Sequence, residues 1–93
     1  MAWFLVEIRY DQDRYGAVRP RHREFLTGLA EQGVVAVAGP LGDGSGGITL
    51  YQAEDREALQ AIIDRDPYFV EGAVADHTVR EFQPLIGAWV PGQ

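Results

Sequence analysis

Cysteine and lysine are both absent from this chain of 93 residues, and all eight of its basic residues are arginine. Without cysteine the chain has no disulfide framework and no thiolate that could act as a nucleophile or bind a metal ion. Without a lysine amine it has no group for Schiff-base chemistry. These two absences exclude thiol, disulfide and Schiff-base mechanisms.

Long hydrophobic runs are absent as well. No apolar stretch approaches the roughly 18–20 residues of a membrane-spanning helix, and residues 1–10 lack the basic start of a signal peptide. Hydrophobic residues nonetheless make up 46% of the chain, a share typical of globular proteins. We therefore expect a globular protein with a cytoplasmic location and no membrane partner.

The chain is short for a protein with its own core. One domain is expected at this length, and a domain this small buries only about 60–65% of its chain surface on folding. Association with a second copy is a common remedy where disulfides are absent. A homodimer is therefore the first partner that the sequence predicts.

Negative charge predominates, because the formal net charge is -6. Such a protein is a poor binder of nucleic acid, which requires many cationic contacts. The segment from residue 8 to residue 23 is an exception, since five arginines there outnumber two aspartates and give a local charge of +3. This segment suits a small anionic ligand, and a solvated arginine-rich turn is an equal alternative.

Periodicity and turn residues predict elements in the order β-α-β-β-α-β. Strands are predicted over residues 2–10, 34–41, 48–53 and 74–82, and helices over 20–32 and 55–64. The strand at 34–41 has the small and β-branched composition of one buried on both faces. Pro20 marks the start of the first helix, after a polar loop over 11–18. The order predicts an α+β fold, with a ferredoxin-like, antiparallel four-stranded sheet covered on one face by both helices.

The predicted sheet face opposite the helices is partly apolar. Its apolar residues on this interpretation are Trp3, Leu5, Val35, Val37, Tyr51 and Val79. A half-apolar open face on a small domain is typical of a dimer interface. The tail over residues 85–93 is apolar too. We expect it to pack either on its own domain, residues 1–84, or on the partner subunit.

His22 and Asp66 are the candidate catalytic residues. Helical spacing places His22 on the buried stripe of the first helix, in its first turn, and Asp66 at the end of the second helix. The two helices of this fold run antiparallel, so these ends meet at one edge of the sheet. A carboxylate beside a histidine fixes the imidazole tautomer and stabilises the imidazolium, which suits general acid–base catalysis. A core histidine beside an ordinary Asp-Pro helix stop is the alternative.

Candidate substrate-binding residues lie in or beside segments that reach the same sheet edge. They are Arg9, Arg19, Arg21, Gly39, Pro40 and Tyr68. The arginines, together with free N–H groups at the start of the first helix, could hold an anionic group. No cofactor is expected. A metal site is not predicted either, because His22 and His77 lack metal-binding spacing.

Several short motifs, taken in order, resemble the YCII-related family. They are Arg19-Pro20-Arg21-His22, Ala38-Gly39-Pro40-Leu41, the glycine turn from Asp43 to Gly47, and Asp66-Pro67-Tyr68, within residues 2–84. The resemblance implies a dimeric α+β barrel of ferredoxin-like subunits, with an active-site pair that matches His22 and Asp66. It also implies similarity in fold to muconolactone isomerases and small monooxygenases. For some relatives it implies lyase-type chemistry on hydroxylated or chlorinated aromatic rings. His77 and the tail have no counterpart in the family pattern.

Together these features predict a small homodimeric enzyme that needs no cofactor. His22, supported by Asp66, would transfer a proton in an elimination, lyase or isomerase reaction on a small anionic or phenolic substrate. There are two alternatives. One is a non-catalytic ligand-binding or regulatory module, and the other is a cofactor-free monooxygenase of the same fold.

Overall fold

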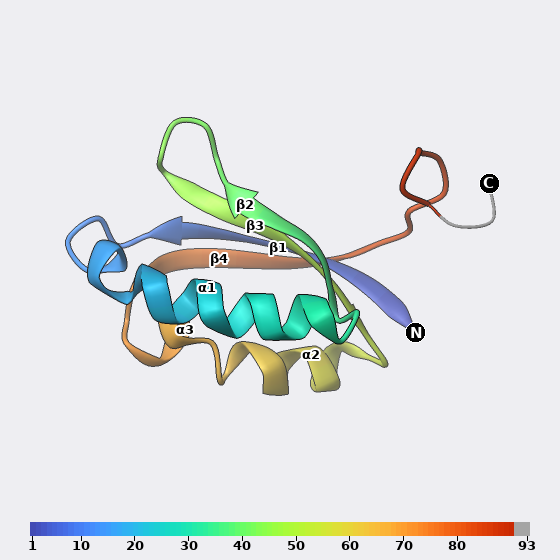
Figure 1. The fold of residues 1–93 in the computed structure, drawn as a ribbon, viewed down its shortest axis with the longest axis horizontal. Helices are drawn as coiled ribbons and strands as arrows, with labels where there is room; N and C mark the ends of the chain where they lie inside the picture. The colour runs from blue at the N-terminus through green and yellow to red at the C-terminus, as the bar shows by residue number, and fades with distance from the viewer. Residues whose placement is uncertain (91–93) are drawn as a thin grey trace.

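The computed structural model describes residues 1–90, and it is a single antiparallel sheet with helices on one face (Figure 1). The elements are β1 (Ala2–Tyr10), α1 (Tyr15–Glu31), β2 (Val35–Pro40), β3 (Gly46–Ala53), α2 (Arg56–Ile63), α3 (Pro67–Val70) and β4 (Val74–Phe82). The predicted α+β, ferredoxin-like order is confirmed. Within the described part of the chain, no helix is both long and apolar enough to cross a membrane.

The strand order is β2-β3-β1-β4, so β1 lies in the interior of the sheet, between β3 and β4. Alternate residues of β1 point to opposite faces, and the face that meets the helices carries Phe4, Val6, Ile8 and Tyr10, all buried. The core forms where this face meets buried residues of the helices, among them Leu26, Leu29, Leu59 and Ile63. Burial of such side chains stabilises a fold by roughly 1.5–3 kcal/mol each.

α1 begins at Tyr15, five residues before the predicted start at Pro20. The backbone N–H of Tyr15 donates to the carbonyl of Asp11, and Val18 is buried against the core, so the helix starts within the predicted loop. Pro20 therefore lies inside the helix, where it has no N–H to donate to the carbonyl of Gly16. His22 is in the third turn rather than the first. The free N–H groups of the helix start are consequently not beside it, and that expectation was wrong.

β2 is an edge strand, which contradicts the prediction of a strand buried on both faces. It pairs with β3 alone, and of its residues only Val35 is buried. The pairing shifts in register between Val35 and Val37, as at a β-bulge. A short segment of small and β-branched residues is compatible with an edge strand as well as with a central strand. Composition alone therefore could not distinguish these two positions in the sheet.

The open face of the sheet is half apolar, although three residues assigned to it lie elsewhere. Trp3, Leu5 and Val37 are on the open face as predicted, and Ile48, Leu50 and Phe82 join them through the strand register. Val35, Tyr51 and Val79 instead face the helices. Tyr51 pairs with Phe4 and with Val35, and Val79 pairs with Val6, so all three share the buried face.

The tail after β4 leads away from the domain (Figure 1). Leu85, Ile86 and Trp89 are 67%, 91% and 86% exposed, so these large apolar side chains do not pack on the sheet or helices. Residues 91–93 of the predicted tail segment lie outside the described part. Packing of the tail on a partner subunit stays a prediction.

Gly46 offers a sharp test of this sheet. A Cβ placed on Gly46 would lie 1.8 Å from the carbonyl oxygen of Ile8. The backbone of β1 passes so close to Gly46 in β3 that no side chain fits between them. We expect Gly46→Ala to lower the free energy of unfolding by at least ~3 kcal/mol in urea titrations followed by circular dichroism. Gly42→Ala is the matched control, since its Cβ would meet open space. Equal unfolding midpoints for the two variants would contradict the strand register.

Candidate functional site

His22 and Asp66 are in direct contact. The Nδ1 atom of His22 lies 2.8 Å from Oδ1 of Asp66, and their side chains are 14% and 2% exposed. The contact joins α1 to α3, because Asp66 does not end α2 as expected but forms the N-cap of α3. The same Oδ1 accepts the backbone N–H of Tyr68 at 2.9 Å. The predicted proximity is therefore present, although the helix that supplies the aspartate differs.

The Asp66 contact determines which ring nitrogen of His22 is available. A carboxylate accepts hydrogen bonds, so Nδ1 carries the proton and donates it to Asp66. In the described part of the chain no hydrogen bond engages Nε2, which is left as the atom that can take or give a proton. Burial raises the pKa of Tyr51, and the neighbouring Asp66 raises it further, so the Tyr51 hydroxyl remains neutral beside the carboxylate.

Aromatic side chains hold the His22 ring in place. Tyr68 stacks on His22 with ring centroids 3.7 Å apart and an interplanar angle of 14°. Tyr10 meets Tyr68 edge to face at 5.7 Å and stacks on Tyr15 at 4.2 Å. These contacts come from β1, α1 and α3, so three elements fix one imidazole ring. Such support keeps a reacting group in a single geometry.

Arg19 is a positive charge built into the same cluster. Its guanidinium lies over the Tyr15 ring, 5.1 Å from the centroid. The neighbouring Tyr68 raises the pKa of Arg19, which therefore keeps its charge. Burial raises the pKa of Tyr10 as well, so its phenol stays neutral beside the cation.

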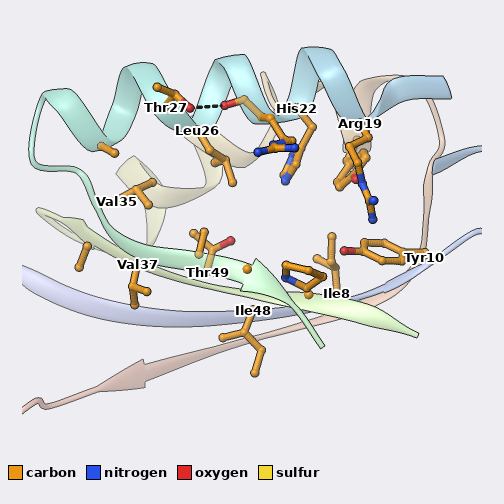
Figure 2. A pocket seen from close by; sticks show the side chains of 18 residues that line it. Ile8, Tyr10, Arg19, His22, Leu26, Thr27, Val35, Val37, Ile48 and Thr49 are labelled. Carbon is orange, nitrogen blue, oxygen red and sulfur yellow. Dashed lines mark hydrogen bonds between the residues drawn. The ribbon is translucent and has the colours of Figure 1, made fainter. Parts of the chain in front are cut away.

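A cavity of about 520 Å³ lies between α1 and the β2–β3 pair. In Figure 2, His22 and Arg19 point from α1 into this space, and the Tyr10 hydroxyl faces it from the sheet. The described lining includes two arginines, Arg19 and Arg23, and no carboxylate. The cavity wall is therefore positive in a chain of net charge -6.

Most of the predicted binding residues line this cavity, namely Arg19, Gly39, Pro40 and Tyr68. Arg9 and Arg21 do not line it. Arg9 is exposed, with Asp76 as its cross-strand partner and Leu5 and Glu7 on the same open face. Arg21 makes a bidentate ion pair with Glu71 on the outside of α1 and α3. The guanidinium of Arg21 is engaged there rather than beside His22.

Thr49 and Tyr10 are among the lining residues that the sequence analysis did not assign to the site. Thr49 is 9% exposed and lines the cavity from β3. Tyr10 supplies a hydroxyl group to the cavity lining from β1. The alternation of side chains along β1 and β3 places both residues on the face that meets the helices. This alternation is the sequence signal that could have identified them.

His77 does not join the site. It is exposed on β4 and meets Phe69 edge to face at 5.0 Å. Within residues 1–90 no three histidine, aspartate or glutamate side chains gather in a manner that would hold a metal ion. An imidazole whose Nδ1–H is held by a carboxylate can take or give a proton at its other nitrogen.

The tautomer of His22 can be observed directly. With neutral imidazoles, ¹⁵N long-range correlation spectra should show His22 protonated at Nδ1, because Asp66 accepts that hydrogen. His77 is the internal control, since no carboxylate holds its ring and it should show the Nε2–H form that free imidazoles favour. An Nε2–H signal for His22 would mean that the Asp66 contact does not orient the ring in solution.

Comparisons with known proteins agree with this fold. The family model of the YCII-related domain matches residues 2–83. The 5-chloro-2-hydroxyhydroquinone dehydrochlorinase of Burkholderia phenoliruptrix, solved in complex with 2,5-dihydroxybenzoquinone, is 18% identical with a TM-score of 0.76, covering 87% of this chain and 93% of that chain. A candidate antibiotic biosynthesis monooxygenase of Bacteroides thetaiotaomicron is 19% identical with a TM-score of 0.67, covering 94% and 91%. No curated protein matches the chain.

The structural likenesses are below the identity at which activity can be carried across, so they establish the fold alone. They confirm the ferredoxin-like α+β fold. The family match is independent of them and spans most of the sequence. This protein therefore belongs to the family of YCII-related domains.

Proposed function

We propose that this protein is a cofactor-independent enzyme in which His22 and Asp66 perform general acid–base proton transfer. The reaction is of the elimination, lyase or isomerase type, and the substrate is a small anionic or phenolic molecule. The observation that carries the proposal is the 2.8 Å contact between Nδ1 of His22 and Asp66 at the wall of an open cavity. A purely structural histidine has no need of a cavity beside its free nitrogen.

In the proposed step, Nε2 of His22 takes a proton from a carbon or hydroxyl group of the substrate. The electron pair of the broken bond forms a new double bond, and in an elimination the leaving group departs with its own bonding pair. Asp66 stabilises the imidazolium that results, because its buried carboxylate already holds Nδ1–H. In an isomerisation His22 returns the proton to another atom of the same molecule.

The electrostatics of the cavity support an anionic or phenolic substrate. Arg19 lies over the Tyr15 ring and beside Tyr68 and Tyr10, which restrict its position before a ligand arrives. A preorganised guanidinium stabilises negative charge that develops on oxygen when a proton is removed nearby. The structural neighbour described as a dehydrochlorinase in complex with 2,5-dihydroxybenzoquinone supports a ring of this kind as a first substrate to test.

Activity can be tested as chloride release from 5-chloro-2-hydroxyhydroquinone. We expect His22→Gln to slow the reaction by at least ~100-fold, because the proton acceptor is lost. Asp66→Asn keeps an acceptor for the Tyr68 N–H but removes the charge that stabilises the imidazolium, so the rate should fall more than ~10-fold. His77→Gln is the matched control and should retain the wild-type rate.

Equal rates for His22→Gln and His77→Gln would refute the proposed role of His22. Binding of 2,5-dihydroxybenzoquinone without turnover of any hydroxylated chloroaromatic would favour a ligand-binding module. Consumption of molecular oxygen during turnover would favour the monooxygenase alternative. The second structural neighbour, which is described as a monooxygenase, is the reason to test for it.

The proposal includes a homodimer formed through the open sheet face. That face carries a row of apolar side chains, and the exposed tail adds more. Val37 and Phe82 are each 45% exposed, which is costly for a monomer in water. A cytoplasmic location, expected from the sequence, also stays a prediction.

A charge placed on the open face should prevent dimer formation. Leu50 lies at the centre of that face, opposite Leu5 and Val37. We expect Leu50→Glu to convert a dimeric mass to a monomeric one in size-exclusion chromatography with light scattering. Ala61→Glu, on the exposed side of α2, is the control and should keep the dimeric mass. A wild-type protein that is monomeric at high concentration would end this part of the proposal.

A further inference from the structure

The geometry points to an elongated amphipathic anion as the ligand of the cavity: a carboxylate or phenolate whose apolar extension is longer than one aromatic ring. This inference deepens the proposed function and rests on it for the anionic group. It concerns a property on which the proton-transfer step does not depend, namely the length and polarity of the cavity. Three features carry it.

The first feature is the length of the cavity. Its lining follows one side of α1 from Arg19 through His22 and Leu26 to Ala30. These positions are three or four residues apart and so form one stripe on the helix. At about 1.5 Å of rise per residue, the eleven steps from Arg19 to Ala30 span roughly 16 Å. A single six-membered ring covers less than half of that distance.

The second feature is that the two ends differ in polarity. At one end lie the Arg19 guanidinium and the Tyr10 hydroxyl, which Figure 2 shows facing the same space. Gly47 keeps this end open, because a Cβ there would lie 3.1 Å from the Tyr10 hydroxyl and 3.1 Å from the carbonyl of Gly39. The end therefore offers a cation and hydroxyl groups to an oxygen anion, with no carboxylate in the described lining.

The other end is apolar. Leu26, Ala30 and Val35 line it, and Leu26 and Val35 are part of the hydrophobic core. Thr27 offers no free donor there, since its hydroxyl donates to the carbonyl of Arg23 at 2.7 Å. In Figure 2 the side chain of Leu26 points from α1 toward the strands. A hydrocarbon extension therefore fits this end.

The third feature is the volume. The cavity measures about 520 Å³, whereas about 150 Å³ is enough to hold benzene. A one-ring ligand at the Arg19 end would leave most of the space unfilled. His22 is one helical turn from Arg19, so its free nitrogen faces an atom a few bonds from the anionic oxygen. The reacting centre is therefore next to the anionic group and the extension lies beyond it.

The test is calorimetric titration with unbranched saturated carboxylates from butanoate to decanoate, below their micelle concentrations. We expect the affinity to rise roughly three- to fourfold for each added methylene, because each is buried in the apolar end. Ala30→Trp should abolish this gain while butanoate affinity stays within twofold. Ala61→Trp, on the exposed side of α2, should behave as wild type. Arg19→Met should weaken all members of the series by a similar factor.

An affinity that does not depend on chain length would overturn the inference, and so would a gain that survives Ala30→Trp. His22→Gln separates this inference from the proposed function. It should preserve the chain-length dependence, since the imidazole nitrogen is not needed for the extension to bind. Chloride release that requires His22, combined with no chain-length dependence, would leave the proposed function standing and refute this inference alone. Chain-length dependence without any His22-dependent reaction would support this inference and refute the proposed function.

Discussion

The buried carboxylate of Asp66 is the constraint on which the site depends. A charge that is 1% exposed is strongly unfavourable unless hydrogen bonds compensate for lost water, and one oxygen of Asp66 accepts both His22 Nδ1–H and the Tyr68 backbone N–H. Those two donors belong to α1 and α3. Satisfying one carboxylate therefore fixes the position of α3, the orientation of the imidazole and the stacking of Tyr68 on it. The Arg21–Glu71 ion pair ties the same two helices from the solvent side.

The cavity lies between α1 and the β2–β3 pair, where β2 forms an irregular edge of the sheet. β2 pairs on one side only, and its register with β3 shifts between Val35 and Val37. The strand is therefore irregular beside the helix. Edge strands tolerate such irregularity at little cost, since no second neighbour must match them. Rigid elements surround the cavity elsewhere, with β3 as its floor and α1 as its roof. This combination of a rigid frame and one irregular edge leaves room for a ligand without weakening the core.

Sequence patterns recovered what depends on local periodicity. They predicted β1 and β4 with their observed limits, the Asp55 cap of α2, and the proximity of His22 to Asp66. They failed where distant groups decide. The start of α1 is set by Asp11 and by burial of Val18, which outweigh the local signal of Pro20. Likewise, sequence spacing does not predict that Glu71 pairs with Arg21 while Arg19 lies beside the tyrosines. Which arginine pairs with Glu71 depends on how α3 packs against α1.

The absence of lysine has a consequence for the cavity that goes beyond excluded chemistry. Both cations in its described lining are guanidinium groups, which retain their charge at any pH at which a protein remains folded. The contribution of the two arginines to the potential of the cavity is thus constant, and it cannot be titrated away as that of an ammonium group can. Acidity changes can then act on ligand capture through only two variables, the ionisation of the ligand and the protonation of one imidazole. The arginine charges of the cavity therefore stay the same while those two protonation equilibria shift with pH.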